Sequence, residues 1–90
     1  MLIPVRSSRL KRDVRKAGAR GKDLSKLRVL LESLIEQEPL AARHRDHPLR
    51  GIWKGHREAH IEPDCLVIYC VRGNELHLIR TGTHSDLFTE

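Results

Sequence analysis

Long hydrophobic runs are missing from this sequence. Its longest apolar stretch, residues 65–71, is far shorter than the roughly 20 residues that a membrane-spanning helix requires. The first residues also lack the basic-then-apolar order of a signal peptide. We therefore expect a soluble cytoplasmic protein that does not associate with membranes. A length of 90 residues with 39% hydrophobic content fits a single domain over residues 1–90 with one modest core.

Cysteine is scarce, and its spacing argues against a disulfide. The two cysteines, Cys65 and Cys70, fall on one predicted strand, where five residues span roughly 17 Å. A disulfide needs Cα atoms about 4.4–6.8 Å apart. We expect both thiols to be reduced, as is usual in the cytoplasm.

Acidic residues are rare in the first third of the chain. Residues 1–30 hold ten Lys and Arg but two Asp and Glu, whereas residues 31–90 hold seven and ten. Arginine outnumbers lysine twelve to five, and its planar fork grips phosphate or carboxylate with two bonds. The charge is typical of a protein that binds a polyanion, either nucleic acid or an acidic protein. A basic surface that serves only solubility remains an alternative.

Two amphipathic helices are predicted between residues 7 and 38. Ser7 and Ser8 are suitable N-caps for the first helix, whose apolar stripe is Leu10, Val14 and Ala17 and which ends at Gly18 to Gly21. Asp23 caps the second helix, which Pro39 terminates. Its predicted buried stripe comprises Leu24, Leu27, Leu31, Leu34 and Ile35, widened by Val29 and Leu30. With a short turn between them, the two helices form a hairpin.

The remaining apolar segments predict strands. Residues 2–5 suit an edge strand because Pro4 is tolerated there, and residues 40–52 resemble a charged loop. Period-two alternation begins at residue 53, an apolar run covers 65–71, and alternation returns over 76–81 before a short tail. The predicted fold is α+β with the order β-α-α-β-β-β. Its sheet is mainly antiparallel, with the helical hairpin on one face.

Histidine is abundant, with six residues that all follow residue 43. Its charge changes near neutral pH, so several histidines on one sheet indicate acid–base chemistry or a metal. His56 and His60 would suit zinc on a helix, but on a strand they are about 13 Å apart. The His44-x-x-His47 pair and Cys65 lack a recognisable ligand spacing. We therefore predict no metal and no other cofactor.

Metal-free cleavage of RNA is a second reading of these residues. The 2′-hydroxyl of RNA can attack its own phosphodiester if a base, an acid and a cation are in place. The last strands and turns supply His60, Asp64, Arg80 and His84, and the preceding loop supplies His47. Any exposed ring among the only aromatic residues, Trp53, Tyr69 and Phe88, is a candidate for stacking on a base.

Two segments carry a resemblance to a known family. The runs DHPLRGIWKGHREAHIEPD and RTGTHSDLF, together with the basic helical hairpin, resemble the RelE/ParE superfamily of bacterial toxins in its YafQ-like branch. The resemblance extends along nearly the whole chain. It implies the small RelE-like fold and a type II toxin–antitoxin system. It also implies a ribosome-dependent, metal-independent endoribonuclease that cuts mRNA in the A site and stops translation.

The resemblance also implies site residues. The family's catalytic groups fall on His47, His60, Asp64, Arg80 and His84. We expect His84 to be the general acid and His60, with Asp64 beside it, to be or orient the base, while Arg80 and His47 stabilise the phosphorane. Substrate binding is expected at Phe88, Trp53, Lys54 and Arg57, and rRNA binding at Lys11, Arg12, Arg15 and Lys16. Some relatives have tryptophan where this chain has Cys65.

Structural roles remain open for several of these residues. Trp53 suits a core position, Asp64 a Pro-Asp turn, and Phe88 could dock on the sheet. The expected partners are an acidic antitoxin, the ribosome and mRNA, and operator DNA only through the antitoxin complex. A ParE-like toxin of the same fold that poisons gyrase is an alternative, although the three histidines argue against it. A non-catalytic nucleic-acid-binding module is the other.

Overall fold

The helical hairpin forms as the capping residues predict. The computed structural model describes residues 1–88, and α1 spans Ser8–Ala19. The Ser7 hydroxyl accepts a hydrogen bond from the Leu10 amide (2.9 Å) and donates one to the Ile79 carbonyl (2.6 Å). Ser7 therefore caps the helix and ties its start to the sheet.

Helix α2 spans Leu24–Ile35 and begins after Asp23, whose carboxylate accepts from the Ser25 amide at 2.9 Å. Its buried residues are Leu27, Leu30 and Leu34. Two predicted core residues of this helix are wrong, since Leu24 is 37% and Val29 61% exposed. A helix that packs on one sheet buries a single stripe of side chains, so apolar residues beside that stripe face solvent.

The sheet has five strands in the order β1-β5-β4-β3-β2. They are β1 (Ile3–Arg6), β2 (His47–Pro48), β3 (Arg57–Glu62), β4 (Cys65–Arg72) and β5 (Glu75–Gly82). Strand β1 is an edge strand parallel to β5, and the other pairs are antiparallel. The mainly antiparallel α+β prediction is thus confirmed for the described residues.

The segment before β3 departs from the predicted loop and strand. The short strand β2 lies inside the predicted loop 40–52, and β3 begins at Arg57 instead of residue 53. Residues Gly51–Trp53 form a 3₁₀ turn, with positive φ at Gly51 (66°) and Gly55 (91°). Glycine adopts this backbone at little cost, so the chain turns here despite its alternating pattern.

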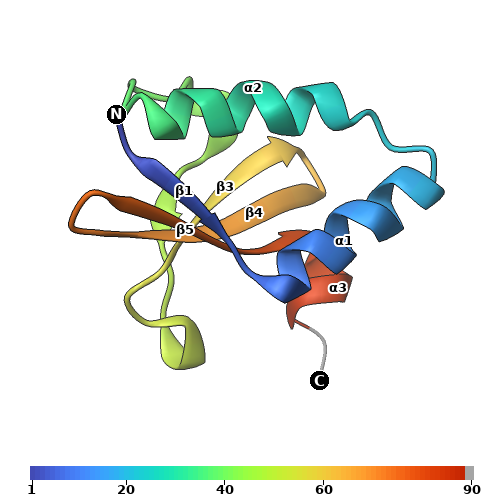
Figure 1. Ribbon diagram of the computed structural model, residues 1–90. Helices are drawn as coiled ribbons and strands as arrows, with labels where there is room; N and C mark the ends of the chain where they lie inside the picture. Colours follow the sequence, from blue (N-terminus) through green and yellow to red (C-terminus); the bar gives the residue numbers. More distant parts are fainter. Residues whose placement is uncertain (89–90) are drawn as a thin grey trace.

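The two faces of the sheet differ. Helices α1 and α2 cover one face, where their leucines pack against Ala59, Val67, Tyr69, Leu76 and Leu78. On the other face a smaller cluster forms, with Leu66, Ile68 and Leu87 at its centre and Leu49, Trp53 and Ile79 around it. Leu87 belongs to α3 (His84–Phe88), a helix where we predicted a tail. Figure 1 shows α2 above the sheet and α3 below it.

Within residues 1–88, none of the helices combines the length and the apolar character needed to cross a membrane.

Candidate active site

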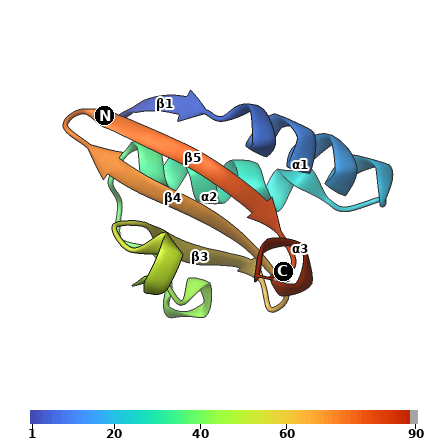
Figure 2. The same cartoon turned by 90° about the horizontal axis from the view of Figure 1, so that it is seen from below.

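The candidate site lies on the sheet face opposite α1 and α2. Alternate residues of β3, Glu58 and His60, point to this face and are both buried. Strand β2 brings His47 opposite Glu58, and α3 brings His84 from the end of the chain. Figure 2 shows α3 beside the ends of β5 and β3. The predicted residues His47, His60 and His84 therefore converge.

His47 is held by a buried carboxylate. Its Nε2 donates to Glu58 Oε2 at 2.7 Å, and its Nδ1 faces the Pro48 carbonyl at 3.1 Å. The Glu58 side chain is 7% exposed, whereas that of His47 is 48% exposed. Since both ring nitrogens face acceptors, only the doubly protonated ring donates at both. This arrangement fixes the His47 ring at the open edge of the site.

His60 occupies the middle of the site. Its backbone carbonyl accepts from His44 Nδ1 at 2.7 Å, which fixes the strand at this point. Its ring centroid lies 6.5 Å from that of His47 and 5.6 Å from that of His84. Among the described residues, neither His60 Nδ1 nor Glu58 Oε1 has a hydrogen-bond partner, although both atoms are buried. Such groups are costly to bury, which is typical of a site that meets a ligand.

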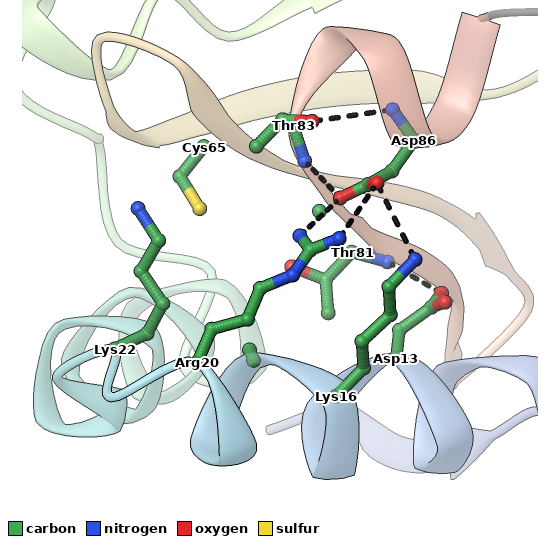
Figure 3. A pocket seen from close by; sticks show the side chains of 10 residues that line it. Asp13, Lys16, Arg20, Lys22, Cys65, Thr81, Thr83 and Asp86 are labelled. Atoms are coloured by element: carbon green, nitrogen blue, oxygen red, sulfur yellow. Dashed lines mark hydrogen bonds and ion pairs between the residues drawn. The ribbon is translucent and has the colours of Figure 1, made fainter.

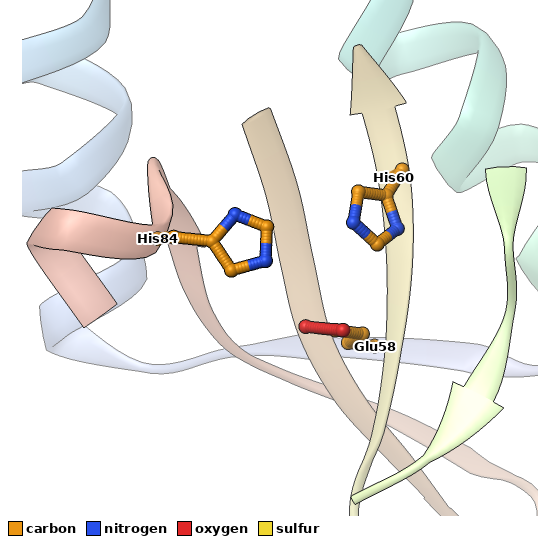
Figure 4. Close-up of side chains that lie close together, drawn as sticks. All are labelled: Glu58, His60 and His84. Carbon is orange, nitrogen blue, oxygen red and sulfur yellow. The ribbon is translucent and has the colours of Figure 1, made fainter. Parts of the chain in front are cut away.

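His84 begins α3 and faces His60, as Figure 4 shows. Its Nδ1 donates to Asp64 Oδ1 at 3.3 Å, and its ring centroid is 5.8 Å from that of Phe88. We predicted Asp64 beside His60, but the structure pairs it with His84. The reason is that the turn between β3 and β4 projects Asp64 past the end of β3, toward α3.

Arg80 forms an ion pair with Asp13 of α1. Its Nε and Nη2 donate to the two oxygens of Asp13 at 2.8 and 3.0 Å, and the Thr81 amide also donates to Asp13. The side chains of Arg80 and Asp13 are only 13% and 11% exposed. This bidentate contact, not a free guanidinium, is what the structure shows at Arg80. Its Nη1 takes no part in the pair.

Arg57 lies on the helix side of the sheet and holds the loop before His47. Its Nε donates to Asp46 Oδ1 at 3.1 Å, and the Tyr69 hydroxyl donates to the same oxygen at 2.7 Å. Burial and the neighbouring Asp46 carboxylate raise the pKa of Tyr69, so the hydroxyl remains a donor at neutral pH. Arg57 was predicted to bind substrate, but β3 alternates and turns its side chain away from Glu58 and His60.

The other predicted binding residues divide by exposure. Lys54 is exposed, and Phe88 is 39% exposed beside His84. Trp53 packs against the Leu66–Ile68–Leu87 cluster and edge-on to His56, so the structure favours its core alternative. On α1, Lys11, Arg12, Arg15 and Lys16 are exposed, and Lys16 Nζ also lies 3.5 Å from Asp86.

Sequence reasoning missed Glu58 as a site residue. Its signal was present, because on a strand Glu58 shares a face with His60 two residues later. Charged residues on strands usually face solvent, so the alternation alone does not single out Glu58. The structure buries it instead, and β2 supplies the histidine that partners it.

The comparisons with known proteins agree with this fold. The family described as the bacterial toxin YafQ of type II toxin–antitoxin systems matches residues 3–89. The chain belongs to the YafQ toxin family. The ParE-like alternative lies in another branch of the superfamily and is not the family that matches.

Relatives in the YafQ family cover nearly the whole chain. The mRNA interferase toxin YafQ of Escherichia coli strain K12 is 47% identical over 83 residues, which are 91% of this chain and 90% of that protein. A crystal structure of the E. coli DinJ-YafQ toxin–antitoxin complex contains a chain with a TM-score of 0.89 and 44% identity, covering 97% of both chains. A metal-bound toxin from Helicobacter pylori has a TM-score of 0.91 and 38% identity, covering 98% of this chain and 100% of that one.

The fold brings together possible metal ligands that no spacing in the sequence indicated. Ligand atoms of Glu58, His60 and His84 all lie within 4.8 Å of one another. Glu58 and His60 each carry a buried atom that has no hydrogen-bond partner among residues 1–88. One carboxylate and two imidazoles are a donor set that zinc or copper accepts. These three residues could therefore hold a divalent cation.

Proposed function

We propose that this chain is an mRNA interferase, a ribosome-dependent endoribonuclease that arrests translation as the toxin of a type II toxin–antitoxin system. The name of the E. coli relative supports the activity. The observation that carries the proposal is the convergence of His47, His60 and His84 around buried Glu58 on one sheet face. Such a group supplies a base, an acid and a cation within one site.

His60 suits the role of general base. It lies between the other two histidines, and among the described residues its Nδ1 has no hydrogen-bond partner. A neutral ring at this position can accept the proton of the ribose 2′-hydroxyl, and the resulting 2′-oxygen attacks the adjacent phosphorus.

His84 suits the role of general acid. Asp64 contacts Nδ1, which leaves Nε2 to give a proton to the departing 5′-oxygen. A carboxylate on one ring nitrogen orients the ring and fixes which nitrogen faces the substrate. The products are then a 2′,3′-cyclic phosphate and a 5′-hydroxyl, and the proton taken by His60 balances the one lost by His84.

Two cations are available for the charge that develops on the phosphorane. His47, held by Glu58 and exposed on its other side, is the nearer to His60. Arg80 could add a contact through Nη1 while its other nitrogens remain on Asp13. Preorganised cations of this kind are a large part of catalysis in phosphoryl transfer.

The same proposal includes the partners. The exposed basic residues of α1 suit ribosomal RNA, and exposed Phe88 and Lys54 suit mRNA in the A site. By analogy with the E. coli complex, an acidic antitoxin holds the toxin, and operator DNA is bound only through that complex.

The test is cleavage of mRNA on programmed ribosomes, with chemical analysis of the new ends. We expect cyclic phosphate and 5′-hydroxyl ends, and loss of about 10²–10⁴ in rate for His84→Ala. The toxin alone is treated with EDTA and desalted before it meets the ribosomes, which themselves need Mg²⁺, and we expect its activity to survive. The matched control is His77→Ala, because His77 pairs with Glu75 on β5, outside the cluster. Ends with 5′-phosphate, or loss of activity in the EDTA-treated toxin, would assign catalysis to a metal at Glu58, His60 and His84.

A further inference from the structure

Helix α3 carries two site residues and is too short to be stable by itself. It comprises five residues, of which only Leu87 is buried. Its backbone hydrogen bond from the Leu87 amide to the Thr83 carbonyl is 3.1 Å long. Helices this short are not stable in isolation, so the position of His84 must depend on contacts to the rest of the molecule.

Besides the burial of Leu87 and the contact of His84 with Asp64, Asp86 supplies such contacts. Its Oδ2 accepts from the Thr83 amide at 3.1 Å, and its own amide donates to the Thr83 hydroxyl at 3.2 Å, which closes the first turn of α3. The same carboxylate accepts from Arg20 Nη1 at 3.0 Å and Nη2 at 3.4 Å, and Lys16 Nζ lies 3.5 Å away. Figure 3 shows Lys16 and Arg20 reaching from α1 to Asp86.

Gly82, just before α3, leaves room for the Asp86 side chain. Gly82 has φ of +154°, and a Cβ atom there would lie 3.0 Å from Asp86 Oδ2 and 3.1 Å from Asp86 Cβ. Another residue at this position would push Asp86 away from α1. The Asp86 side chain is 17% exposed, and the Arg20 guanidinium holds the pKa of its carboxyl far below the ordinary range. Asp86 is therefore ionised throughout the neutral range.

We propose that Asp86 is a positioning residue that anchors α3 to the C-terminal end of α1 and thereby sets His84 over His60. The inference rests on the catalytic role of His84 proposed above. It links the basic helix to the catalytic face through one carboxylate. Neither Arg20 nor Asp86 touches the reacting groups, so both act through the placement of α3.

The substitution Asp86→Asn separates this role from plain electrostatics. Asparagine retains an oxygen for the Thr83 amide but lacks the charge that holds Arg20 and Lys16. The variant is more positive than the wild type, so general attraction to ribosomal RNA would become stronger. Anchoring predicts the opposite for the chemistry, namely slower cleavage on saturating ribosomes, by about tenfold to a hundredfold, since small displacements of a catalytic group have effects of this size.

A double-mutant cycle tests the link to α1. Asp86→Asn, Arg20→Gln and the double variant are compared by their cleavage rate on saturating ribosomes and, separately, by their affinity for ribosomes. Non-additive rate effects, with the double variant close to Asp86→Asn alone, support the anchor. Additive effects, or a slower rate explained by weaker ribosome binding, overturn it. Arg72→Gln removes one positive charge at the far end of β4 and is the matched control.

Amide exchange of Leu87 gives a readout that does not depend on activity. The anchor predicts faster exchange in Asp86→Asn and in Arg20→Gln, and no change in Arg72→Gln. Unchanged exchange in both variants overturns the anchor, even if His84→Ala is inactive and the proposed function stands. A different result is faster Leu87 exchange in Asp86→Asn together with full activity in both Asp86→Asn and His84→Ala. That result would show that His84 is not the general acid, and that Asp86 does not position it for catalysis.

Discussion

At the scale of single residues, the site depends on one buried carboxylate. Glu58 has one oxygen 2.7 Å from His47 Nε2 and the other without a partner among the described residues. A charge in this position is tolerated only if it is paired. Glu58 therefore holds the His47 ring in one orientation at the site.

We expect Glu58→Gln to slow cleavage by about tenfold to a hundredfold, because a hydrogen bond to a charged group contributes roughly 1.5–3 kcal/mol. The amide can still accept from His47, but it no longer stabilises the charged ring. Single-turnover cleavage on ribosomes measures the effect. Glu75→Gln is the control, since Glu75 contacts His77 away from the site. Equal rates for wild type and Glu58→Gln would show that His47 works without its carboxylate.

At the scale of elements, the two sides of α1 carry different kinds of residue. Its inner side carries Leu10 in the core and Asp13, which grips Arg80 and the Thr81 amide of β5. Its outer side exposes Lys11, Arg12 and Arg15. Because Lys16 contacts Asp86, it belongs to the structural side as well.

Replacing Lys11, Arg12 and Arg15 together by Gln should weaken ribosome binding without disturbing the site. If each contacts one phosphate, the slope of log affinity against log salt falls by about 0.7–0.9 per residue, or roughly 2–3 in total. Titration of ribosomes at several salt concentrations measures this slope. Cleavage at saturating ribosomes should be retained. An unchanged slope would mean that this side of α1 serves only the antitoxin.

At the scale of the whole molecule, charge is distributed unevenly. The formal net charge is +5, and the excess lies in residues 1–30, which form β1, α1 and the start of α2. A single basic side favours capture by an acidic partner, and such steering acts mainly on the rate of association.

We expect association with the antitoxin to slow as salt is added, while dissociation changes little, because salt screens long-range attraction more than close contacts. Stopped-flow or surface binding kinetics at several ionic strengths measure both rates. The variant with Lys11, Arg12 and Arg15 replaced by Gln should show a smaller salt effect on association. A salt effect confined to dissociation would argue against electrostatic capture.

Acid stability tests the contact between α1 and α3 in the folded molecule. Arg20 first, and then the Thr83 amide, lower the pKa of Asp86, so its stabilising contribution is present above the unfolded value near 4 and is lost as pH falls further. The stability difference between wild type and Asp86→Asn should therefore be constant above about pH 5 and shrink below pH 4. Urea unfolding between pH 3 and 7 measures it. A difference that persists unchanged at pH 3 would mean that the charge of Asp86 does not stabilise the fold.

Much of the fold could be predicted because its signals are local. Ser7 and Asp23 cap α1 and α2 as expected, and the apolar run at 65–71 is the central strand β4. The short elements β2 and α3 were missed. Two and five residues are too few to show a period. Strand β2 depends on its pairing with β3, and α3 depends on a contact with α1, 66 residues earlier in the chain.

The sequence by itself determined the family, the basic helical hairpin and the histidines that converge on one sheet face, because motifs, caps and periodicity depend on neighbouring residues. Only the tertiary structure decided their partners. It paired Arg80 with Asp13, 67 residues away, and Arg20 with Asp86, 66 residues away. It also placed Glu58 against His47, and it placed Asp64 against His84 instead of His60. Such pairs depend on strand register and on the angle at which helices pack, and no local pattern encodes either.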